Sequence, residues 1–228
     1  MHPGFFITGT DTSVGKTLIS CALLRAFANS GKRVVGMKPV AAGCEQSSNR
    51  IQCEDVENLR AAGNVDAPLE LVCPYTFTLP IAPHIAAAKS GVAIELLHIR
   101  AAFERLRHMA DIIIVEGVGG FRVPLNSTED TGDLAKMLGL PIILVVGMRL
   151  GCLNHALLTA QNIAASGLPL AGWIANQTDP TMLYAVENIQ ALAERLPAPL
   201  LATVEHYAIP NTETIARLLP ATQLLSSL

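Results

Sequence analysis

The sequence has no basic footprint, since 16 Lys and Arg residues stand against 19 Asp and Glu residues and the formal net charge is −3. Proteins that bind nucleic acid or anionic membranes through their surface charge carry a clustered excess of positive residues. The composition therefore argues against both functions, and neither nucleic acid nor a membrane is expected as a partner.

Long hydrophobic runs are also missing. No stretch reaches the roughly 18 consecutive apolar residues of a membrane-spanning helix. The start, Met1-His2-Pro3-Gly4, has no basic region, and the apolar stretch after it is too short for a signal peptide. These absences predict a soluble cytoplasmic protein.

The cysteines follow no known pairing pattern. Their number is odd and no C-x-x-C motif occurs, so neither a disulfide framework nor a zinc site is expected. We interpret all five as reduced, small hydrophobic side chains: Cys21, Cys44, Cys53, Cys73 and Cys152.

The sequence repeats the order of a short apolar run, a Gly-rich turn and a segment with helical spacing. The apolar runs predict strands at residues 5–7, 33–37, 111–115, 141–146, 170–175 and 199–204. Apolar stripes from Ile19 to Phe27 and from Leu153 to Ala164 predict two helices. Because continuous apolar strands suit a parallel sheet covered on both faces, we predict a single α/β domain over residues 1–228 with a doubly wound, mostly parallel sheet.

The segment from Ala41 to Pro83 is less regular and contains several Pro and Asn residues. We predict loops and short helices there, on the active-site side of the sheet and not as a separate domain.

The strongest motif is Thr8-Gly9-Thr10-Asp11-Thr12-Ser13-Val14-Gly15-Lys16-Thr17, between a predicted strand and a predicted helix. Glycine removes the Cβ that would block a triphosphate, and successive N–H groups at the helix start then hold the phosphates. Lys16 is predicted to reach the β- and γ-phosphates, and the Thr17 hydroxyl to bind Mg²⁺. Five residues separate Gly9 from Gly15 where four are usual. The alternative is an incidental Gly-Lys-Thr in a turn, but the strand-to-helix position favours a phosphate loop of the P-loop NTPase type.

Two further polar residues stand near predicted strand ends, and a third stands near a possible helix start. Glu116 ends an apolar strand, at the sheet edge where open α/β sheets bind ligands, so it is a candidate Mg²⁺ ligand or a solvated turn residue. Lys38 precedes Pro39 and is either functional or an ordinary surface lysine. Asp55 by itself is more typical of a helix start than of a metal site.

Two later segments remain open in the same way. Asn176 closes a predicted strand, where its amide suits either a purine edge or a turn. The segment Gly151 to His155 opens a helix whose N–H groups suit a carboxylate, although helix capping explains Asn154 nearly as well.

Together these motifs resemble the dethiobiotin synthetase family. Those that carry the resemblance run in order to about residue 201: the phosphate loop from Gly9 to Thr17, Lys38-Pro39-Val40, Pro74-Tyr75-Thr76-Phe77, Val115-Glu116-Gly117, Gly151-Cys152-Leu153-Asn154-His155-Ala156, Gly172-Trp173-Ile174-Ala175-Asn176 and Pro197-Ala198-Pro199-Leu200-Leu201. The C-terminal tail has no clear match.

The resemblance implies a reaction. One amine of 7,8-diaminononanoate captures CO₂ as a carbamate, ATP phosphorylates the carbamate, and the second amine closes the ureido ring of dethiobiotin. It also implies Mg²⁺ as the metal and a homodimer with active sites at the interface.

The resemblance further assigns roles to residues of this chain. Lys16, Lys38 and Thr12 are the implied catalytic residues, and Thr17, Asp55 and Glu116 surround Mg²⁺. The implied nucleotide contacts are Ser13, Val14, Gly15, Lys16, Thr17, Leu18, Asp55, Glu116, Gly117, Val118, Gly119, Asn176, Gln177, Glu205, His206 and Tyr207. The implied substrate contacts are Thr12, Lys38 and Ala42, with Gly151, Cys152 and Asn154 contributed by the partner subunit.

Two positions depart from the family pattern. Ala42 stands where the family usually has a hydroxyl residue at the substrate, which predicts weaker substrate binding with the chemistry intact. Glu205-His206-Tyr207 stands where the family often has a proline-containing loop at the nucleotide.

Three other functions compete with this one. A nucleotide-dependent switch like the partition and septum-positioning ATPases would carry an additional lysine early in the loop, where Thr10 and Asp11 stand here. A cobyrinate-type amide synthase needs a glutaminase domain, for which the chain has no room. A P-loop ATPase paralogue that acts on a different substrate remains open because of Ala42.

Overall fold

The computed structural model describes residues 4–47 and 50–226. Met1, His2 and Pro3, on which the expectation about a signal peptide depends, lie outside these residues. The strands are β1 (Gly4–Gly9), β2 (Val34–Met37), β3 (Val40–Ala42), β4 (Glu45–Ser47), β5 (Arg50–Gln52), β6 (Tyr75–Phe77), β7 (Ile112–Glu116), β8 (Ile142–Gly147), β9 (Leu170–Asn176) and β10 (Leu200–Val204). The helices are α1 (Lys16–Asn29), α2 (Glu54–Ala62), α3 (Leu69–Val72), α4 (Pro83–Lys89), α5 (Leu96–Arg107), α6 (Thr131–Leu138), α7 (Cys152–Ala165), α8 (Ala185–Ala193), α9 (Thr212–Ala216) and α10 (Ala221–Leu225).

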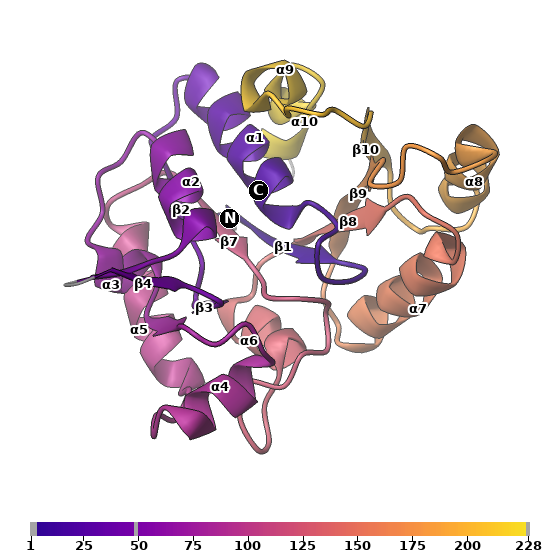
Figure 1. Ribbon diagram of the computed structural model, residues 1–228. Coiled ribbons are helices and arrows are strands. Elements are labelled where there is room, and N and C mark those ends of the chain that lie inside the picture. Colours follow the sequence, from indigo (N-terminus) through magenta and orange to yellow (C-terminus); the bar gives the residue numbers. More distant parts are fainter. Residues whose placement is uncertain (1–3, 48–49, 227–228) are drawn as a thin grey trace.

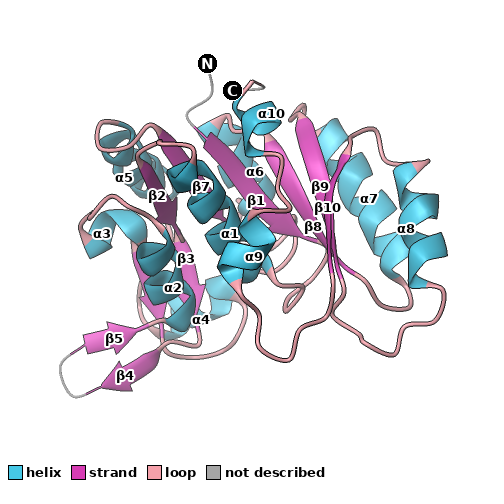
Figure 2. Cartoon of the chain, turned by 90° about the horizontal axis from the view of Figure 1, so that it is seen from above, coloured by secondary structure: helices cyan, strands magenta, loops and turns pink. Residues whose placement is uncertain are grey.

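A six-stranded sheet forms the middle layer, in the order β10-β9-β8-β1-β7-β2, and every pairing within it is parallel (Figure 1). Helices α1, α9 and α10 cover one face, and α5, α6 and α7 cover the other (Figure 2). This arrangement confirms the predicted α/β fold with a mostly parallel sheet.

The central strand β1 has an apolar sequence, without alternating polar residues, because both of its faces are buried. Phe5 and Ile7 pack into the core beneath α1, whereas Phe6 packs into the core on the opposite face, and all three are fully buried. Strands β7 and β8 divide their side chains between the two faces in the same way. A strand covered on both faces has no solvent side, so its sequence has no polar period.

The segment from Ala41 to Pro83 is more ordered than the sequence predicts. The expected short helices are present as α2 and α3, but the segment also holds two small sheets, in which β3 pairs with β6 in parallel and β4 pairs with β5 antiparallel. The prediction of loops and helices alone is therefore wrong. Each of these strands has three residues, which is too short for a hydrophobic period to show in the sequence.

The prediction of five reduced cysteines is also wrong, because Cys44 and Cys53 form a disulfide. The antiparallel register pairs Glu45 with Gln52, which puts the two flanking cysteines opposite each other at a Cα–Cα distance of 4.5 Å. That distance is typical of a directly opposed antiparallel pair. The other three cysteines are free and buried. Within the described part of the chain, no helix is long and apolar enough to span a membrane.

Candidate functional site

The phosphate loop connects β1 to α1 and holds its shape through one buried amide. Gly15 is the N-cap of α1 with φ 89°, and a Cβ at this position would lie 2.2 Å from Asn176 Nδ2. Asn176 Nδ2 donates to Val14 O at 2.8 Å. The loop therefore requires glycine at position 15 both for its backbone conformation and for the space that the amide occupies.

Lys16 turns back over this loop, and its Nζ donates to the carbonyl oxygen of Asp11 at 3.0 Å. The side chain is buried, with 7% of its surface exposed. Burial, followed by the positive charge of Lys38, lowers the pKa of Lys16 from 10.5 to about 8, against the opposing pull of nearby carboxylates. An ammonium group that is poorly solvated in this way is available to an anionic ligand.

Lys38 follows the carboxyl end of β2 and is 4% exposed. Its backbone N–H donates to Val72 O at 2.8 Å, and its Nζ donates to Asp55 Oδ2 at 3.0 Å and to Glu116 Oε1. Burial acts against the charge, but the two carboxylates outweigh it and raise the pKa of Lys38. Of the two possibilities that the sequence left open, the structure excludes the exposed surface lysine.

Thr17, Asp55 and Glu116 converge beside Lys38 from three separate elements. Thr17 Oγ1 lies 2.9 Å from Asp55 Oδ1 and 2.8 Å from Glu116 Oε1. Burial favours the neutral form of Asp55, but the charge of Lys38 and hydrogen bonds from Lys38 and Thr17 lower its pKa. Asp55 thus lies beside donors that favour its ionised form.

The side-chain oxygens of Thr17, Asp55 and Glu116 form a ligand set that fits Mg²⁺. Glu116 is 1% exposed, and its Oε2 has no hydrogen-bond partner among the residues that the structure describes. Mg²⁺ prefers oxygen ligands and takes one or two carboxylates together with phosphate oxygens. Within residues 4–47 and 50–226, no cluster of three or more His, Cys, Asp or Glu side chains could hold a metal by itself.

These groups open onto a cavity of about 350 Å³, which we call the phosphate-side cavity. Most of the residues to which the sequence assigned catalysis, metal binding and phosphate binding contribute to its wall. The lining residues are Thr12, Ser13, Gly15, Lys16, Thr17, Lys38, Ala42, Asp55, Glu116, Val118 and Gly119.

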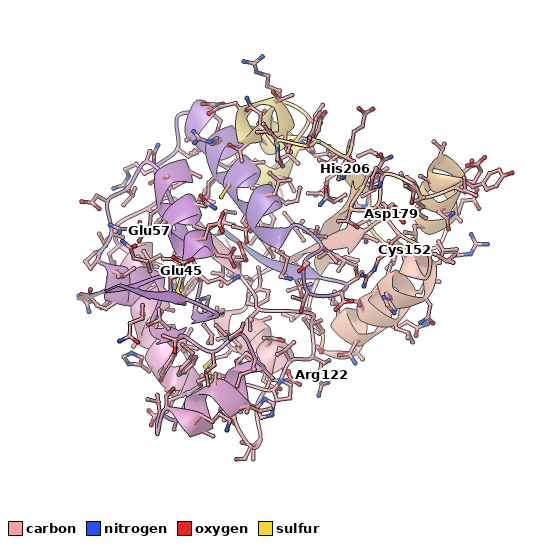
Figure 3. The ribbon with its side chains drawn as sticks, viewed as in Figure 1. Glu45, Glu57, Arg122, Cys152, Asp179 and His206 are labelled. Atoms are coloured by element: carbon pink, nitrogen blue, oxygen red, sulfur yellow. A yellow bond between two sulfur atoms is a disulfide. The ribbon has the colours of Figure 1, made fainter. Side chains whose placement is uncertain are left out.

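A second hollow of about 220 Å³, the base-side cavity, lies between the ends of β9 and β10 and the start of α1. It brings together the residues assigned to the nucleotide base, and its lining residues are Ser13, Leu18, Asn176, Gln177, Thr178, Glu205, His206, Tyr207 and Pro210. Figure 3 shows His206 near Asp179, on the loops that follow these two strands. Because Asn176 already donates to the phosphate loop, it connects the two cavities.

Three of the predicted substrate residues lie apart from both cavities. Gly151, Cys152 and Asn154 stand at the start of α7, where Figure 3 labels Cys152. Gly151 is the N-cap, without a side-chain capping hydrogen bond, so Asn154 does not cap the helix. Cys152 is 2% exposed and its N–H donates to Arg149 O at 3.0 Å.

Two further predicted nucleotide residues, Val14 within the phosphate loop and Gly117 after β7, are buried. Val14 packs under Gly9 and Gly147, where added Cβ atoms would lie 2.6 Å and 2.7 Å from its methyl groups. Gly117 lies against Phe6, and a Cβ added to Gly117 would lie 3.1 Å from Phe6 Cε1. Val14 therefore packs within the loop and Gly117 packs against β1, and neither residue is among those that line the two cavities.

Sequence reasoning missed several residues of the site. Arg149 forms an ion pair with Asp11 in the phosphate loop, and Asp11 Oδ1 accepts from Thr12 N at 2.8 Å. Arg149 could have been predicted as a site residue, because it is a charged residue two positions after the apolar strand β8, at the sheet edge where ligands bind. Thr178 and Pro210 line the base-side cavity, and Pro210 supplies a proline three residues after the segment in which the family pattern has one.

The lowered pKa of Lys16 predicts an effect on stability. A shift from 10.5 to about 8 means that the folded chain holds this charge at a cost of about 3 kcal/mol. We expect Lys16→Met to raise the free energy of unfolding by up to that amount at pH 7. Between pH 8 and 10.5 the unfolded wild-type chain binds more protons than the folded one, so wild-type stability rises and the advantage of the variant disappears.

Urea unfolding at several pH values between 7 and 10.5 measures this effect. The control is Lys32→Met, because Lys32 is exposed. A Lys16→Met advantage that stays constant over this pH range contradicts the argument.

The fold and the loop define a P-loop nucleotide-binding protein. Two solved structures share the fold. A chain of the MinC:MinD cell division protein complex of Aquifex aeolicus matches with a TM-score of 0.57 and 15% identity, over 97% of this chain and 95% of that one. The cell division protein FtsY of Thermotoga maritima matches with a TM-score of 0.50 and 18% identity, over 95% of this chain and 68% of that one.

Sequence relatives narrow the class. The AAA domain family matches residues 3–213. The ATP-dependent dethiobiotin synthetase BioD of Aromatoleum aromaticum is 57% identical over 93% of this chain and 94% of its own length. The enzyme of the same name from Nitrosospira multiformis is 55% identical over 90% of this chain and 89% of its own. The chain belongs to the dethiobiotin synthetase family, a family of ATP-dependent ligases.

Proposed function

We propose that the chain acts as one domain that carboxylates 7,8-diaminononanoate with CO₂ and closes the ring of dethiobiotin, with ATP as co-substrate. The observation that carries the proposal is the convergence of two buried lysines, Lys16 and Lys38, on one cavity with Thr17, Asp55 and Glu116. This combination supplies positive charge for a transferring phosphoryl group and oxygen ligands for its cation.

In this proposal ATP spans the two cavities. Its phosphates lie over the phosphate loop, where Ser13, Gly15 and Lys16 line the wall, and its base lies beside Leu18 and the β9 and β10 loops. The Lys16 ammonium exchanges its hydrogen bond with Asp11 O for one with a phosphate oxygen. The N-terminus of α1 adds a favourable field for the same negative charge.

Thr17, Asp55 and Glu116 would hold Mg²⁺, which supplies charge neutralisation on the phosphates when it is bound. Lys38 keeps its proton at neutral pH because its pKa is raised by both carboxylates. It therefore provides a permanent positive charge beside the carbamate oxygen that attacks the γ-phosphorus. Phosphorylation converts that oxygen into a good leaving group, and the neighbouring amine of the same molecule then displaces phosphate.

We further propose a cytoplasmic homodimer in which the start of α7 serves the partner's site. Large hydrophobic side chains are exposed on and near α7 and α8, among them Leu150 at 96%, Leu183 at 79% and Val186 at 73%. Such a group of exposed apolar residues supports an interface. Gly151, Cys152 and Asn154 lie next to it in sequence, and they would meet the substrate carboxylate.

The test is phosphate release from ATP and Mg²⁺ with bicarbonate, with and without 7,8-diaminononanoate, with the product identified by mass. Release that depends on the diamine, with a product of the mass of dethiobiotin, supports the proposal. Hydrolysis that is indifferent to the diamine rejects this substrate and leaves a P-loop ATPase that acts on another substrate or as a nucleotide-dependent switch.

Ala42 provides a prediction about substrate affinity. Its side chain lines the phosphate-side cavity without a hydroxyl group. We expect Ala42→Ser to lower the KM for the diamine roughly fivefold, the effect of about 1 kcal/mol from one added hydrogen bond, with little change in kcat. Steady-state kinetics with saturating ATP measures both constants, and Ala41→Ser on the adjacent buried position is the control. An unchanged KM for the diamine in Ala42→Ser contradicts the prediction.

A further inference from the structure

We propose that Cys44 and Cys53 form a reversible oxidation site that controls how firmly Asp55 is held and, through it, the affinity for the Mg²⁺–nucleotide complex. The effect on affinity rests on the metal-binding role of Asp55 proposed above. The disulfide itself lies outside the residues assigned to the reaction.

Cys53 connects the disulfide to Asp55. It is the N-cap of α2, and its carbonyl oxygen accepts from Glu57 N at 3.0 Å in the first turn. Asp55 is the second residue of the same helix, and it contacts both Lys38 Nζ and Thr17 Oγ1. The cap residue makes no side-chain capping hydrogen bond, and its side chain is held instead by the disulfide to Cys44.

Cys44 connects the disulfide to the opposite wall of the cavity. Its N–H donates to Phe77 O at 3.0 Å, which fixes it beside the small β3–β6 sheet. Ala42, two residues earlier, lines the phosphate-side cavity together with Asp55. The covalent bond thus joins the two chain segments that carry Ala42 and Asp55.

The position of the disulfide distinguishes it from the other cysteines. The β4–β5 hairpin projects from the body of the molecule (Figure 2), and the neighbours Glu45, Gln52 and Glu54 are exposed. Cys44 and Cys53 are 5% and 7% exposed at the base of this arm. Since exposed residues flank both cysteines, a local opening at these positions would admit a small thiol or peroxide to the sulfur atoms.

The chemistry balances in both directions. In reduction, a dithiol attacks one sulfur, the S–S bond breaks, and two protein thiols and one oxidised dithiol result. In oxidation, a peroxide converts one thiol to a sulfenic acid with loss of an alcohol or water, and the second thiol displaces water to form the disulfide. Disulfides in reducing compartments are usually transient and redox-sensing, which agrees with a switch in a chain proposed to be cytoplasmic.

The experiment measures binding and needs no turnover. The full chain is prepared in an oxidised and a reduced form. Thiol alkylation with mass analysis verifies that Cys44 and Cys53 are alkylated in the reduced form and protected in the oxidised form. Calorimetry then gives the Kd of a non-hydrolysable ATP analogue with Mg²⁺ and, separately, with a chelator. Groups that orient a metal ligand typically change metal affinity about 10- to 100-fold, and the disulfide acts more remotely, so we expect reduction to weaken Mg²⁺-dependent binding roughly three- to tenfold.

Binding in chelator is the internal control, because Asp55 then has no metal to hold and the Kd should change little. Cys44→Ala/Cys53→Ala should bind like the reduced wild-type chain under both conditions. Cys73→Ala, which removes a buried free thiol from the same core, should keep the full redox response.

Three outcomes overturn the proposal. One is a chain that oxidant does not cross-link between these residues, and another is an equal Kd in two verified redox states. The third is an equal loss of binding with and without Mg²⁺, which shows a general structural effect. Because no diamine is used, failure of the proposed reaction leaves this test interpretable.

Discussion

Replacing Lys38 by glutamine is expected to lower kcat for diamine-dependent phosphate release by about 10²- to 10³-fold, the typical effect of removing one preorganised donor from a developing charge. The reason is that Lys38 carries a buried positive charge, with its Nζ bonded to both Asp55 and Glu116. Glutamine keeps donors of similar reach but supplies no charge. Rapid-quench measurement of phosphate formation at saturating ATP and diamine tests the chemical step.

Two controls separate catalysis from folding. Lys32→Gln removes an exposed lysine and should leave kcat unchanged. Binding of the ATP analogue to Lys38→Gln in chelator should stay close to wild type, which shows an intact phosphate loop even where the uncompensated Glu116 lowers stability. Retention of more than about one tenth of wild-type kcat would show that the charge of Lys38 is not required, and the Lys38 part of the mechanism would be rejected.

Substituting Gly15 by alanine is expected to weaken ATP binding at least about 100-fold. The added Cβ would stand 2.2 Å from Asn176 Nδ2, and the backbone has φ 89°. Left-handed backbone alone costs alanine about 1–2 kcal/mol. The clash adds to this, because Asn176 cannot move away without losing its 2.8 Å hydrogen bond to Val14 O. Calorimetric titration with the ATP analogue measures the loss.

Gly91→Ala is the matched control. Gly91 also has a positive φ of 66°, but nothing lies within 4 Å of an added Cβ. This variant should lose about 1 kcal/mol of stability and bind ATP normally. If Gly15→Ala loses no more affinity than Gly91→Ala, the contact between Gly15 and Asn176 is not what shapes the loop.

The sequence predicted the sheet well because its strands carry strong local signals. The strands predicted at residues 111–115 and 141–146 correspond to β7 and β8, with bounds that differ by one residue. They were predictable because a strand buried on both faces must be apolar throughout. The phosphate loop was equally clear, as glycine and lysine must stand at fixed positions between β1 and α1. Local chemistry is sufficient in both cases.

The role of Asp55 could not be predicted from the residues next to it in the sequence. In sequence it is one acid among several at a helix start, and only the folded chain brings it 2.9 Å from Thr17, which is 38 positions away. Glu116 reaches the same hydroxyl across 99 positions. The Cys44–Cys53 disulfide was missed for the same reason, because the pairing depends on a hairpin whose three-residue strands carry no recognisable period.

By itself, then, the sequence determined the α/β fold, the phosphate loop and, through its motifs, the dethiobiotin synthetase family. Only the tertiary structure decided that Lys38 is buried between two carboxylates, that Asn176 holds the phosphate loop, and that Arg149 pairs with Asp11. The physical reason is range. Strand and loop signals come from residues that are neighbours in the chain, whereas burial, ion pairing and disulfide formation depend on neighbours that folding alone supplies.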